Sequence, residues 1–301
     1  MKLFITGAAS FVGAELKAQC RAQGIEFAGI DAVADGPDTG VADIRAADLA
    51  QAIPDNVDAV VHLAAVSRDP DCRRDPVQCY DINVAGTVNV YEAARARGAR
   101  QLIFASTEWV YDSFEPGRAK CEDDAIDLRK LTSDYAISKL AAEAALFARH
   151  QQTGMPVTVL RFGIIYGPRR TNWSAVEALL AAVAKGDRVE VGARATARCF
   201  IHVTDIARGI LASVGREDYE VFNIQGDAPV KLGDVIDASG RLLGRRPEII
   251  ETNAVAPNVR NVSNAKARAV LGWQPQIGIS AGLATVADFL DLVREDACLT
   301  P

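Results

Sequence analysis

The sequence lacks the features that would place the protein in a membrane or on nucleic acid. No run of apolar residues among the 301 reaches the roughly 18 that a membrane-spanning helix needs. Basic charge is not in excess, because 33 Lys and Arg residues stand against 39 Asp and Glu, giving a net charge of −6. Nucleic acids and anionic lipid surfaces favour a positive surface, so we expect neither as a partner. A strand pattern begins at Lys2, and we therefore expect no signal peptide.

Cysteine is sparse and has no metal-binding pattern. No two cysteines form a CxxC pair, and no histidine lies at a zinc-ligand spacing from two of them. The six cysteines are Cys20, Cys72, Cys79, Cys121, Cys199 and Cys298. We therefore expect reduced thiols, no metal and a cytoplasmic location.

Strand and helix patterns alternate along the first half of the chain. Short, nearly continuous runs of Val, Ile, Leu and Phe are typical of strands that are buried on both faces of a sheet. They lie at Lys2–Thr6, Glu26–Ile30, Ala59–Leu63, Gln101–Ala105 and Val157–Phe162. Amphipathic helical patterns separate them, at Phe11–Gln23, Pro76–Arg97 and Tyr135–Thr153. The alternation predicts an α/β fold, a doubly wound parallel sheet of the Rossmann type with helices on both faces.

The pattern becomes irregular after about residue 165, where Pro and Gly are more frequent. We predict that residues 1–165 form the sheet domain and that residues 166–301 are mainly a smaller C-terminal region. A helical pattern at Val203–Val214 and a strand pattern at Val221–Ile224 resemble the first half again. We therefore expect residues 199–224, approximately, to return to the first domain.

A glycine-containing turn joins the first strand to the first helix. Its sequence is Thr6-Gly7-Ala8-Ala9-Ser10-Phe11-Val12-Gly13. Gly7 permits a tight turn with positive φ, and Gly13 permits the helix to pack closely on the sheet. Backbone N–H groups at the helix start then face a pyrophosphate, which the helix dipole also favours. The position between a strand and a helix indicates a dinucleotide site, the alternative being an ordinary βα turn.

Asp31 ends the second strand pattern. A carboxylate there accepts hydrogen bonds from the adenosine ribose of a dinucleotide and repels a 2′-phosphate. Ala32 and Val33 follow it, so no arginine is present to bind such a phosphate. The residues favour NAD over NADP, the alternative being a solvated turn aspartate.

Several motifs together resemble the extended short-chain dehydrogenase/reductases, and specifically the NAD-dependent epimerase/dehydratase family. The turn at Thr6–Gly13 resembles the TGxxGxxG pattern of that family. Further motifs follow in family order over about 270 residues: Asp43-Ile44, His62-Leu63-Ala64-Ala65, Asn83-Val84-Ala85-Gly86-Thr87, Ser106-Thr107, Tyr135-Ala136-Ile137-Ser138-Lys139, Tyr166-Gly167-Pro168-Arg169, Arg198-Cys199-Phe200-Ile201-His202-Val203 and Leu271-Gly272-Trp273. Such a set is specific for fold and much less specific for substrate.

The resemblance implies a site for NAD and a site for a sugar substrate. It places the cofactor against Gly7, Ser10, Phe11, Val12, Gly13, Asp31, Asp43, Ile44, Leu63, Ala64, Ala65, Asn83, Tyr135 and Lys139. It places the substrate against Thr107, Glu108, Trp109, Arg198 and Arg260. Arg198 resembles the arginine that binds the diphosphate of a nucleotide sugar, a role for which a planar guanidinium is suited.

Thr107, Tyr135 and Lys139 form the expected catalytic set. Tyr135 and Lys139 are four residues apart in a helical pattern, so their side chains share one face. A free tyrosine has a pKa near ~10, and we expect Lys139 and an oxidised nicotinamide to lower it. The Thr107 hydroxyl can both donate to and accept from the reacting oxygen. His62 and His202 lie in or beside apolar strand patterns, and we interpret both as structural.

Four positions depart from the family pattern. Ser10 replaces the middle glycine of the turn, which puts the NAD affinity in question. Trp109 stands where sugar-nucleotide dehydratases usually carry an acid, and Glu108 is one residue early. Ile164 and Cys199 replace an Asn and an Asp that are usual in sugar-nucleotide enzymes. These changes suggest an atypical sugar or a substrate without a nucleotide.

We therefore predict an NAD-dependent epimerase that acts on a sugar, which we expect to be nucleotide-linked, through a transient keto intermediate with Tyr135 as acid and base. The alternatives are a sugar dehydrogenase or reductase, a 4,6-dehydratase and, in a different class, a non-enzymatic NAD-bound sensor. Long Ala-rich helical patterns at Asn83–Arg97 and Tyr135–His150 suggest a homodimer, because family members often pair these helices. The alternative is that both helices only cover the sheet.

Overall fold

A computed structural model describes residues 1–292 of the chain. Cys298 and the end of the predicted C-terminal region, residues 293–301, lie outside the described residues. Within residues 1–292, none of the helices combines the length and the apolar character needed to cross a bilayer.

A parallel sheet of seven strands forms the centre of the larger part of the molecule, with the strand order β11-β6-β5-β4-β1-β2-β3. The strands are β1 (Lys2–Thr6), β2 (Glu26–Asp31), β3 (Thr39–Val41), β4 (Ala59–His62), β5 (Leu102–Thr107), β6 (Val157–Phe162) and β11 (Tyr219–Ile224). The order reverses between β1 and β4, because the chain moves outward from β1 first to one edge and then to the other. The predicted doubly wound parallel sheet is confirmed, and such a reversal opens a crevice at the carboxyl ends of the strands.

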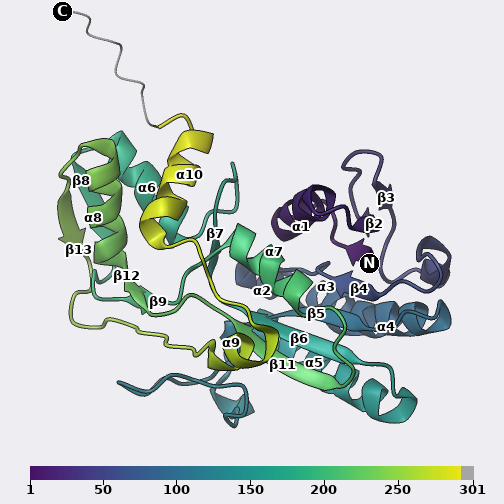
Figure 1. Cartoon of the computed structure of the whole chain (residues 1–301). Helices are drawn as coiled ribbons and strands as arrows, with labels where there is room; N and C mark the ends of the chain where they lie inside the picture. Colours follow the sequence, from purple (N-terminus) through teal and green to yellow (C-terminus); the bar gives the residue numbers. More distant parts are fainter. Residues whose placement is uncertain (293–301) are drawn as a thin grey trace, which may run out of the picture.

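Alternate residues of the strands point to opposite faces, where helices cover them (Figure 1). On β1, Leu3 and Ile5 face the side of α1 (Phe11–Ala22), α7 (Val203–Ala212) and α9 (Ala265–Leu271). Phe4 faces the other side, that of α4 (Thr87–Ala96) and α5 (Asp134–Thr153).

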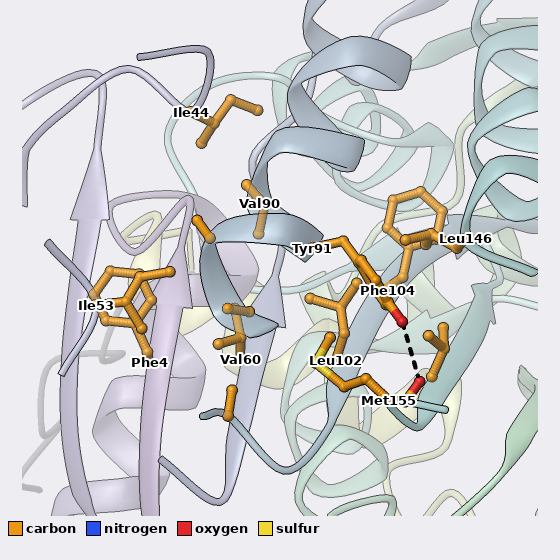
Figure 2. Packing of buried hydrophobic residues seen from close by; sticks show 14 of the residues in the cluster. Phe4, Ile44, Ile53, Val60, Val90, Tyr91, Leu102, Phe104, Leu146 and Met155 are labelled. Atoms are coloured by element: carbon orange, nitrogen blue, oxygen red, sulfur yellow. Dashed lines mark hydrogen bonds between the residues drawn. The ribbon is translucent and has the colours of Figure 1, made fainter. Parts of the chain in front are cut away.

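Figure 2 shows this second layer, in which strand residues lie beside Val90 and Tyr91 of α4 and Leu146 of α5. The Tyr91 hydroxyl donates a hydrogen bond to the Met155 carbonyl at 3.4 Å (Figure 2). Burial on both faces explains the continuous apolar strand runs of the sequence.

A smaller group of elements lies apart from the sheet, on the left in Figure 1. It contains α6 (Ala175–Lys185), α8 (Leu232–Leu243), α10 (Ile279–Phe289) and the parallel pair β8 (Arg188–Val191) and β13 (Glu248–Glu251). These elements share an apolar core of their own, in which Leu180, Val235 and Leu283 are fully buried. Two short pairs join the parts: β7 (Ile165–Tyr166) with β10 (Ile201–His202), and β9 (Ala197–Arg198) with β12 (Val230–Lys231).

The helix predicted over Pro76–Arg97 is interrupted in the structure. After α2 (Asp69–Arg74), α3 covers only Pro76–Tyr80, and a wider helical turn over residues 81–86 precedes α4. Asn83 lies in this turn, and its side-chain amide bonds both the N–H and the C=O of Val66. The wider turn therefore lies where the Asn83 side chain bonds Val66, in the loop after β4.

The expectation that all cysteines are reduced is wrong for Cys72 and Cys79. The structure joins them in a disulfide, with Cα atoms 5.0 Å apart. The two residues are only seven positions apart, but α2 and α3 bring them together, which no CxxC pattern signals. Cys20 and Cys199 are free and buried, and Cys121 is free and exposed.

Candidate active site

A crevice of about 540 Å³ lies at the carboxyl ends of the strands next to the reversal point. Segments that follow β1, β2, β3 and β4 supply its walls. Of the residues predicted to bind a cofactor, it is lined by Gly7, Ser10, Asp31, Asp43, Ile44, Leu63, Ala64 and Ala65. The other predicted cofactor residues do not line this cavity: Phe11, Val12, Gly13, Asn83, Tyr135 and Lys139. Eight residues from four separate segments thus converge on one space, as expected for a site at a strand-order reversal.

The two glycines of the turn leave no room for a side chain. Gly7 has φ +72°, and a Cβ placed on it would lie 2.6 Å from the backbone nitrogen of Ala64. A Cβ on Gly13 would lie 2.4 Å from the carbonyl oxygen of Gly7. Real Cβ atoms essentially never make contacts this short, so a side chain at either position would force the backbone of the turn to shift.

Ser10 is the N-cap of α1, and its Oγ accepts a hydrogen bond from the Gly13 N–H at 3.1 Å. Serine is a preferred N-cap residue because its oxygen satisfies an N–H group of the first turn. The substitution of the usual middle glycine therefore has a local reason. The Ser10 side chain still lines the crevice, where its hydroxyl hydrogen is free to point at a ligand.

Asp31 is the last residue of β2 and is not merely a solvated turn residue. One carboxylate oxygen accepts a hydrogen bond from the Ala9 N–H of the glycine turn at 2.9 Å. The other accepts a longer bond of 3.4 Å from Val33 N–H, at the rim of the crevice. Asp31 thus ties the end of β2 to the turn after β1 and keeps acceptor capacity at the crevice.

Asn83 does not line the crevice but hydrogen-bonds Val66, a residue of the crevice wall. Its Oδ1 accepts from Val66 N–H at 2.8 Å, and its Nδ2 donates to the Val66 carbonyl at 3.0 Å and to the Ser138 hydroxyl at 2.9 Å. Asn83 is fully buried, so its contribution to the crevice is the position of the loop that carries Val66. Ser138 lies on α5 beside Lys139, so the same amide joins the crevice to the expected catalytic helix.

Thr107, Tyr135 and Lys139 come together between β5 and α5. Thr107 is the last residue of β5, and its Oγ1 accepts from Trp109 N–H at 3.2 Å. Tyr135 and Lys139 lie one turn apart in α5, whose N-cap is Ser133. The Lys139 ammonium donates to the Ala105 carbonyl on β5 at 2.8 Å and lies 4.6 Å from the centre of the Phe104 ring. The ammonium of Lys139 is thus held by the backbone of β5 at Ala105, two residues before Thr107.

The electrostatics of this set differ from the expectation. Burial raises the pKa of Tyr135 to about 12, against the effect of the Thr107 hydroxyl, which lowers it. Burial lowers the pKa of Lys139 to about 7, although the charge of Glu143 opposes this change. The protein alone therefore does not lower the Tyr135 pKa, and a cation supplied by a ligand is needed to do so.

A buried polar network that was not predicted from the sequence lies under this set. Glu143 lies one turn beyond Lys139 on α5 and forms an ion pair with Arg161 of β6, at 2.7 Å. Its carboxylate also accepts a hydrogen bond from Ser106, the residue between Ala105 and Thr107. Glu143 and Arg161 are 4% and 5% exposed, so the pair is rigid and fixes α5 on the sheet. The four-residue spacing of Tyr135, Lys139 and Glu143 could have signalled it.

Glu108, Arg198 and Arg260 face one another on the other side of Thr107. Glu108 is fully buried, and its two carboxylate oxygens accept no hydrogen bond from the described residues. Burial raises the pKa of Glu108 to about 7, against the charges of Arg260 and Arg198, which lower it. Arg260 lies 5.2 Å from the centre of the Trp109 ring, so the four substrate-side residues predicted beyond Thr107 form one group.

The two histidines of the strand patterns, His62 and His202, have structural partners. The ring nitrogens of His62 bond the hydroxyls of Thr6, at 2.6 Å, and Thr87, at 2.9 Å. Burial lowers the pKa of His62 to about 3, so it is neutral. His202 bonds Thr285 and the backbone at the start of α7. Neither ring has a nitrogen left for a ligand, as the sequence interpretation requires.

A second cavity, of about 570 Å³, adjoins the crevice at Ser67, which lines both. Arg68 enters it from the loop after β4, and the segment Arg169–Ser174 forms the rest of its wall. Arg169 is paired with buried Glu177, at 2.7 Å, and Arg68 bonds Asn172, at 3.1 Å. This basic cavity was not predicted, because its arginines come from segments about 100 residues apart.

A model of the NAD dependent epimerase/dehydratase family matches residues 3–224. Three relatives carry three different reaction names. UDP-glucuronate 4-epimerase of Thermodesulfobacterium geofontis is 29% identical over 76% of this chain and 71% of its own. dTDP-glucose 4,6-dehydratase of Streptomyces griseus is 31% identical over 76% of this chain and 71% of its own. GDP-6-deoxy-D-mannose reductase of Pseudomonas aeruginosa is 28% identical over 98% of this chain and 99% of its own.

Two solved structures have the same fold over nearly the whole chain. MoeE5 in complex with UDP-glucose and NAD has a TM-score of 0.84 and 26% identity, covering 97% of this chain and 99% of its own. UDP-glucose 4-epimerase of Thermus thermophilus in complex with NAD has a TM-score of 0.83 and 26% identity, with the same coverage.

Proposed function

The chain belongs to the NAD-dependent epimerase/dehydratase family, and we propose that it is an epimerase that acts on a nucleotide-linked sugar through a transient keto intermediate. The observation that carries this proposal is the convergence of Thr107, Tyr135 and Lys139 between the carboxyl end of β5 and the first turns of α5. An NAD-bound sensor would need none of these three side chains. Their arrangement therefore supports an enzyme.

The crevice fits NAD, the cofactor of the family. Gly7 and Gly13 leave backbone space that a Cβ would fill, and Asp31 offers a carboxylate oxygen at the rim. The start of α1 supplies N–H groups for a pyrophosphate, with Ser10, Phe11 and Val12 beside it. A bound NAD would supply the hydride-transfer chemistry that these residues assist.

The chain's own residues supply the proton transfer. Tyr135 removes the proton of the sugar hydroxyl as the adjoining C–H bond is broken, and it returns that proton in the reverse step. Thr107 holds the reacting oxygen, because its hydroxyl both donates and accepts. Lys139, fixed by Ala105, would hold the nicotinamide ribose of a bound NAD and, as an ammonium, would add positive charge near the tyrosine.

Trp109 supports epimerisation over dehydration. Elimination of water needs an acid and a base in addition to the tyrosine, and Trp109 can supply neither. Glu108 is acidic, but its carboxylate is buried toward Arg198 and Arg260. The group around Glu108 is therefore better suited to bind an anionic part of the substrate than to complete a dehydratase site.

A sugar reductase or dehydrogenase is the second candidate. The reductase from Pseudomonas aeruginosa matches this chain almost from end to end, whereas the epimerase and the dehydratase match about three quarters of it. The same catalytic set serves both reactions. They differ in whether NAD is restored within each turnover or exchanged with solution.

Purified protein tests this proposal in two steps. Mass spectrometry of the released ligands identifies the cofactor, and a panel of UDP-, GDP-, CDP- and dTDP-sugars is then assayed with added NAD and, for their keto forms, with added NADH. Epimerisation without net change in NAD or NADH supports the proposal, and stoichiometric reduction of NAD, or oxidation of NADH by a keto sugar, supports the dehydrogenase or reductase. No conversion of any sugar, together with the same result for Tyr135→Phe, contradicts enzymatic function.

We also propose a homodimer that forms through α4 and α5. The two helices lie side by side and share an ion pair between Glu92 and Arg149, at 3.6 Å. Phe147 of α5 is 48% exposed between the small residues Ala144 and Ala148. Light scattering should show a dimer for the wild type and a monomer for Phe147→Glu; a monomeric wild type contradicts this proposal.

A further inference from the structure

Glu108 is the most unusual polar group among the described residues. It is 0% exposed, and neither carboxylate oxygen accepts a hydrogen bond within the described chain. Burial of a carboxylate without a hydrogen-bond donor is strongly unfavourable, so such a group persists only if something else satisfies it. Glu108 directly follows Thr107, so a bound substrate is the nearest group that could do so.

Arg260, in the same group, also has a nitrogen without a hydrogen-bond acceptor among the described residues. The guanidinium of Arg260 lies between the rings of Trp109, at 5.2 Å, and Phe114, at 5.5 Å. Its Nη1 is buried and has no hydrogen-bond acceptor in the described part of the chain. The Nη1 of Arg198 bonds the carbonyls of Ala197 and Asn258. A ligand that satisfies this site must therefore offer an acceptor to Arg260 and a polar group to Glu108.

We infer that Glu108 binds the substrate as a neutral carboxyl group, and that it takes up a proton when the substrate's diphosphate engages Arg198 and Arg260. This inference rests on the proposed nucleotide-sugar substrate. It assigns to Glu108 a hydrogen-bond donor role toward the bound ligand. It also makes the affinity for that ligand depend on pH, whereas the affinity for NAD does not involve this group.

The charges around Glu108 determine the direction of the effect. The groups that face it from other segments are Arg198 and Arg260, whose charges favour the carboxylate, and the thiol of Cys199. Burial raises the pKa of Cys199 to about 11, so this thiol stays neutral. With the arginines free, Glu108 has a pKa of about 7 and is largely ionised above that pH. A diphosphate neutralises the arginines and adds negative charge, which raises the Glu108 pKa further.

Calorimetry of UDP-glucose binding measures this proton directly. The diphosphate of UDP-glucose is a diester that does not titrate near neutrality, so proton uptake reports on the protein. Titrations at pH 7.5 in buffers with different ionisation enthalpies should show roughly 0.5–0.8 proton taken up per UDP-glucose bound. Above pH 7 the dissociation constant should rise, approaching tenfold per pH unit. If UDP-glucose does not bind, the tightest of dTDP-, GDP- and CDP-glucose replaces it.

Two variants separate Glu108 from other titrating groups. Glu108→Gln keeps the shape and the donor but has no titrating proton, so uptake should fall to near zero and the affinity should be independent of pH between 6.5 and 8.5. Glu190→Gln removes the same charge from an exposed position on β8 and should behave as wild type. Because the wild-type uptake is measured first, the inference is testable even if Glu108→Gln does not fold.

The outcomes distinguish this inference from the proposed function. Binding of a nucleotide sugar without proton uptake, or with uptake that persists in Glu108→Gln, overturns the role of Glu108 and leaves the epimerase proposal intact. Failure of all four nucleotide sugars to bind overturns the nucleotide-sugar substrate, and this inference with it. Uptake that disappears only in Glu108→Gln supports it.

Discussion

The cofactor side and the substrate side of the site differ in how completely the chain satisfies its own polar groups. On the cofactor side, Asp31 bonds the glycine turn, Asn83 bonds Val66 and Ser138, and His62 bonds two threonines. On the substrate side, Glu108 and one nitrogen of Arg260 have no partner among residues 1–292.

The polar groups of the cofactor side are therefore held in place by the chain itself, whereas Glu108 and the Arg260 nitrogen of the substrate side lack partners within the described chain without a ligand. The cofactor crevice is defined by backbone groups whose positions are fixed by glycines, helix caps and strand ends. The substrate group depends on charged side chains that meet only through tertiary structure. Substitutions on the two sides should therefore affect different ligands.

The largest effect is expected at the chemical step. Tyr135→Phe keeps the ring and removes the acid/base group, so turnover should fall by roughly 10²–10⁴-fold while NAD remains bound. Tyr91→Phe is the matched control, because it removes a buried hydroxyl that bonds Thr153 and Met155, far from the crevice. It should cost about 1 kcal/mol of unfolding free energy and leave turnover unchanged. Near-normal turnover of Tyr135→Phe would show that another group transfers the proton.

The second largest effect is expected for Arg198→Ala, which should weaken substrate binding and leave NAD binding nearly unchanged. Loss of a charged contact to a buried phosphate costs about 2–5 kcal/mol, so the substrate dissociation constant should rise by at least tenfold. The NAD dissociation constant should change little, because Arg198 does not line the crevice. Arg194→Ala, at an exposed arginine of the same segment, serves as the control. Equal weakening of both ligands would mean that the two sides are not independent.

Gly7→Ala should weaken the binding of NAD, on the cofactor side of the site. Its Cβ would meet the Ala64 backbone at a positive φ, so we expect a loss of about 1–3 kcal/mol of stability and at least tenfold weaker NAD binding. Gly24→Ala has a similar φ of +66° and open space around it, and should cost only the left-handed conformation, about 1 kcal/mol. Thermal unfolding and NAD titration measure both. An alanine at Gly7 that binds NAD normally would contradict the proposed cradle.

The sequence revealed the cofactor side better than the substrate side, for a physical reason. Gly7, Gly13 and the end of β2 act through local backbone geometry, which a short pattern specifies. Tyr135 and Lys139 are equally local, because one helix turn separates them. Glu108 and Arg260 are brought together only by the folding of the C-terminal segment, so no spacing predicts that both lack a partner.

The predictions that were wrong also concern features that depend on tertiary structure. The helix predicted over Pro76–Arg97 has a continuous amphipathic pattern, but Asn83 bonds a distant loop and widens one turn. The thiols of Cys72 and Cys79 were predicted to be free, because a pairing that depends on two short helices meeting leaves no local signature. The expected lowering of the Tyr135 pKa assumed the cation of Lys139 and a bound nicotinamide, whereas burial dominates in the protein alone.

A moderate effect is expected from pH on NAD binding. The pKa of Lys139 is about 7 in the cofactor-free protein, below its usual value because of burial. If the ammonium form binds the ribose, NAD affinity should fall by up to tenfold per pH unit above 7, and Lys139→Met should show a flatter profile. The unfolded chain keeps the lysine proton to about pH 10, so this group makes unfolding free energy increase with pH between 7 and 10. An NAD affinity that is independent of pH in the wild type would mean that Lys139 does not bind as a cation.

The smallest effect, and the finest test of the cofactor side, concerns the choice between NAD and NADP. The carboxylate of Asp31 lies at the rim of the crevice and would repel a 2′-phosphate, and Arg45, which also lines the crevice, is paired with Asp43 and Asp81. A repulsion between partly solvated charges is worth about 1 kcal/mol, so Asp31→Ala should weaken NAD a few-fold and narrow its advantage over NADP by roughly fivefold. Asp38→Ala is a suitable control, because Asp38 lies before the amino end of β3, does not line the crevice and is paired with Arg21. Part of any change in Asp31→Ala comes from the lost bond to Ala9, but that loss weakens both cofactors equally. The ratio of the two dissociation constants therefore isolates the charge, and an unchanged ratio would remove Asp31 from the discrimination.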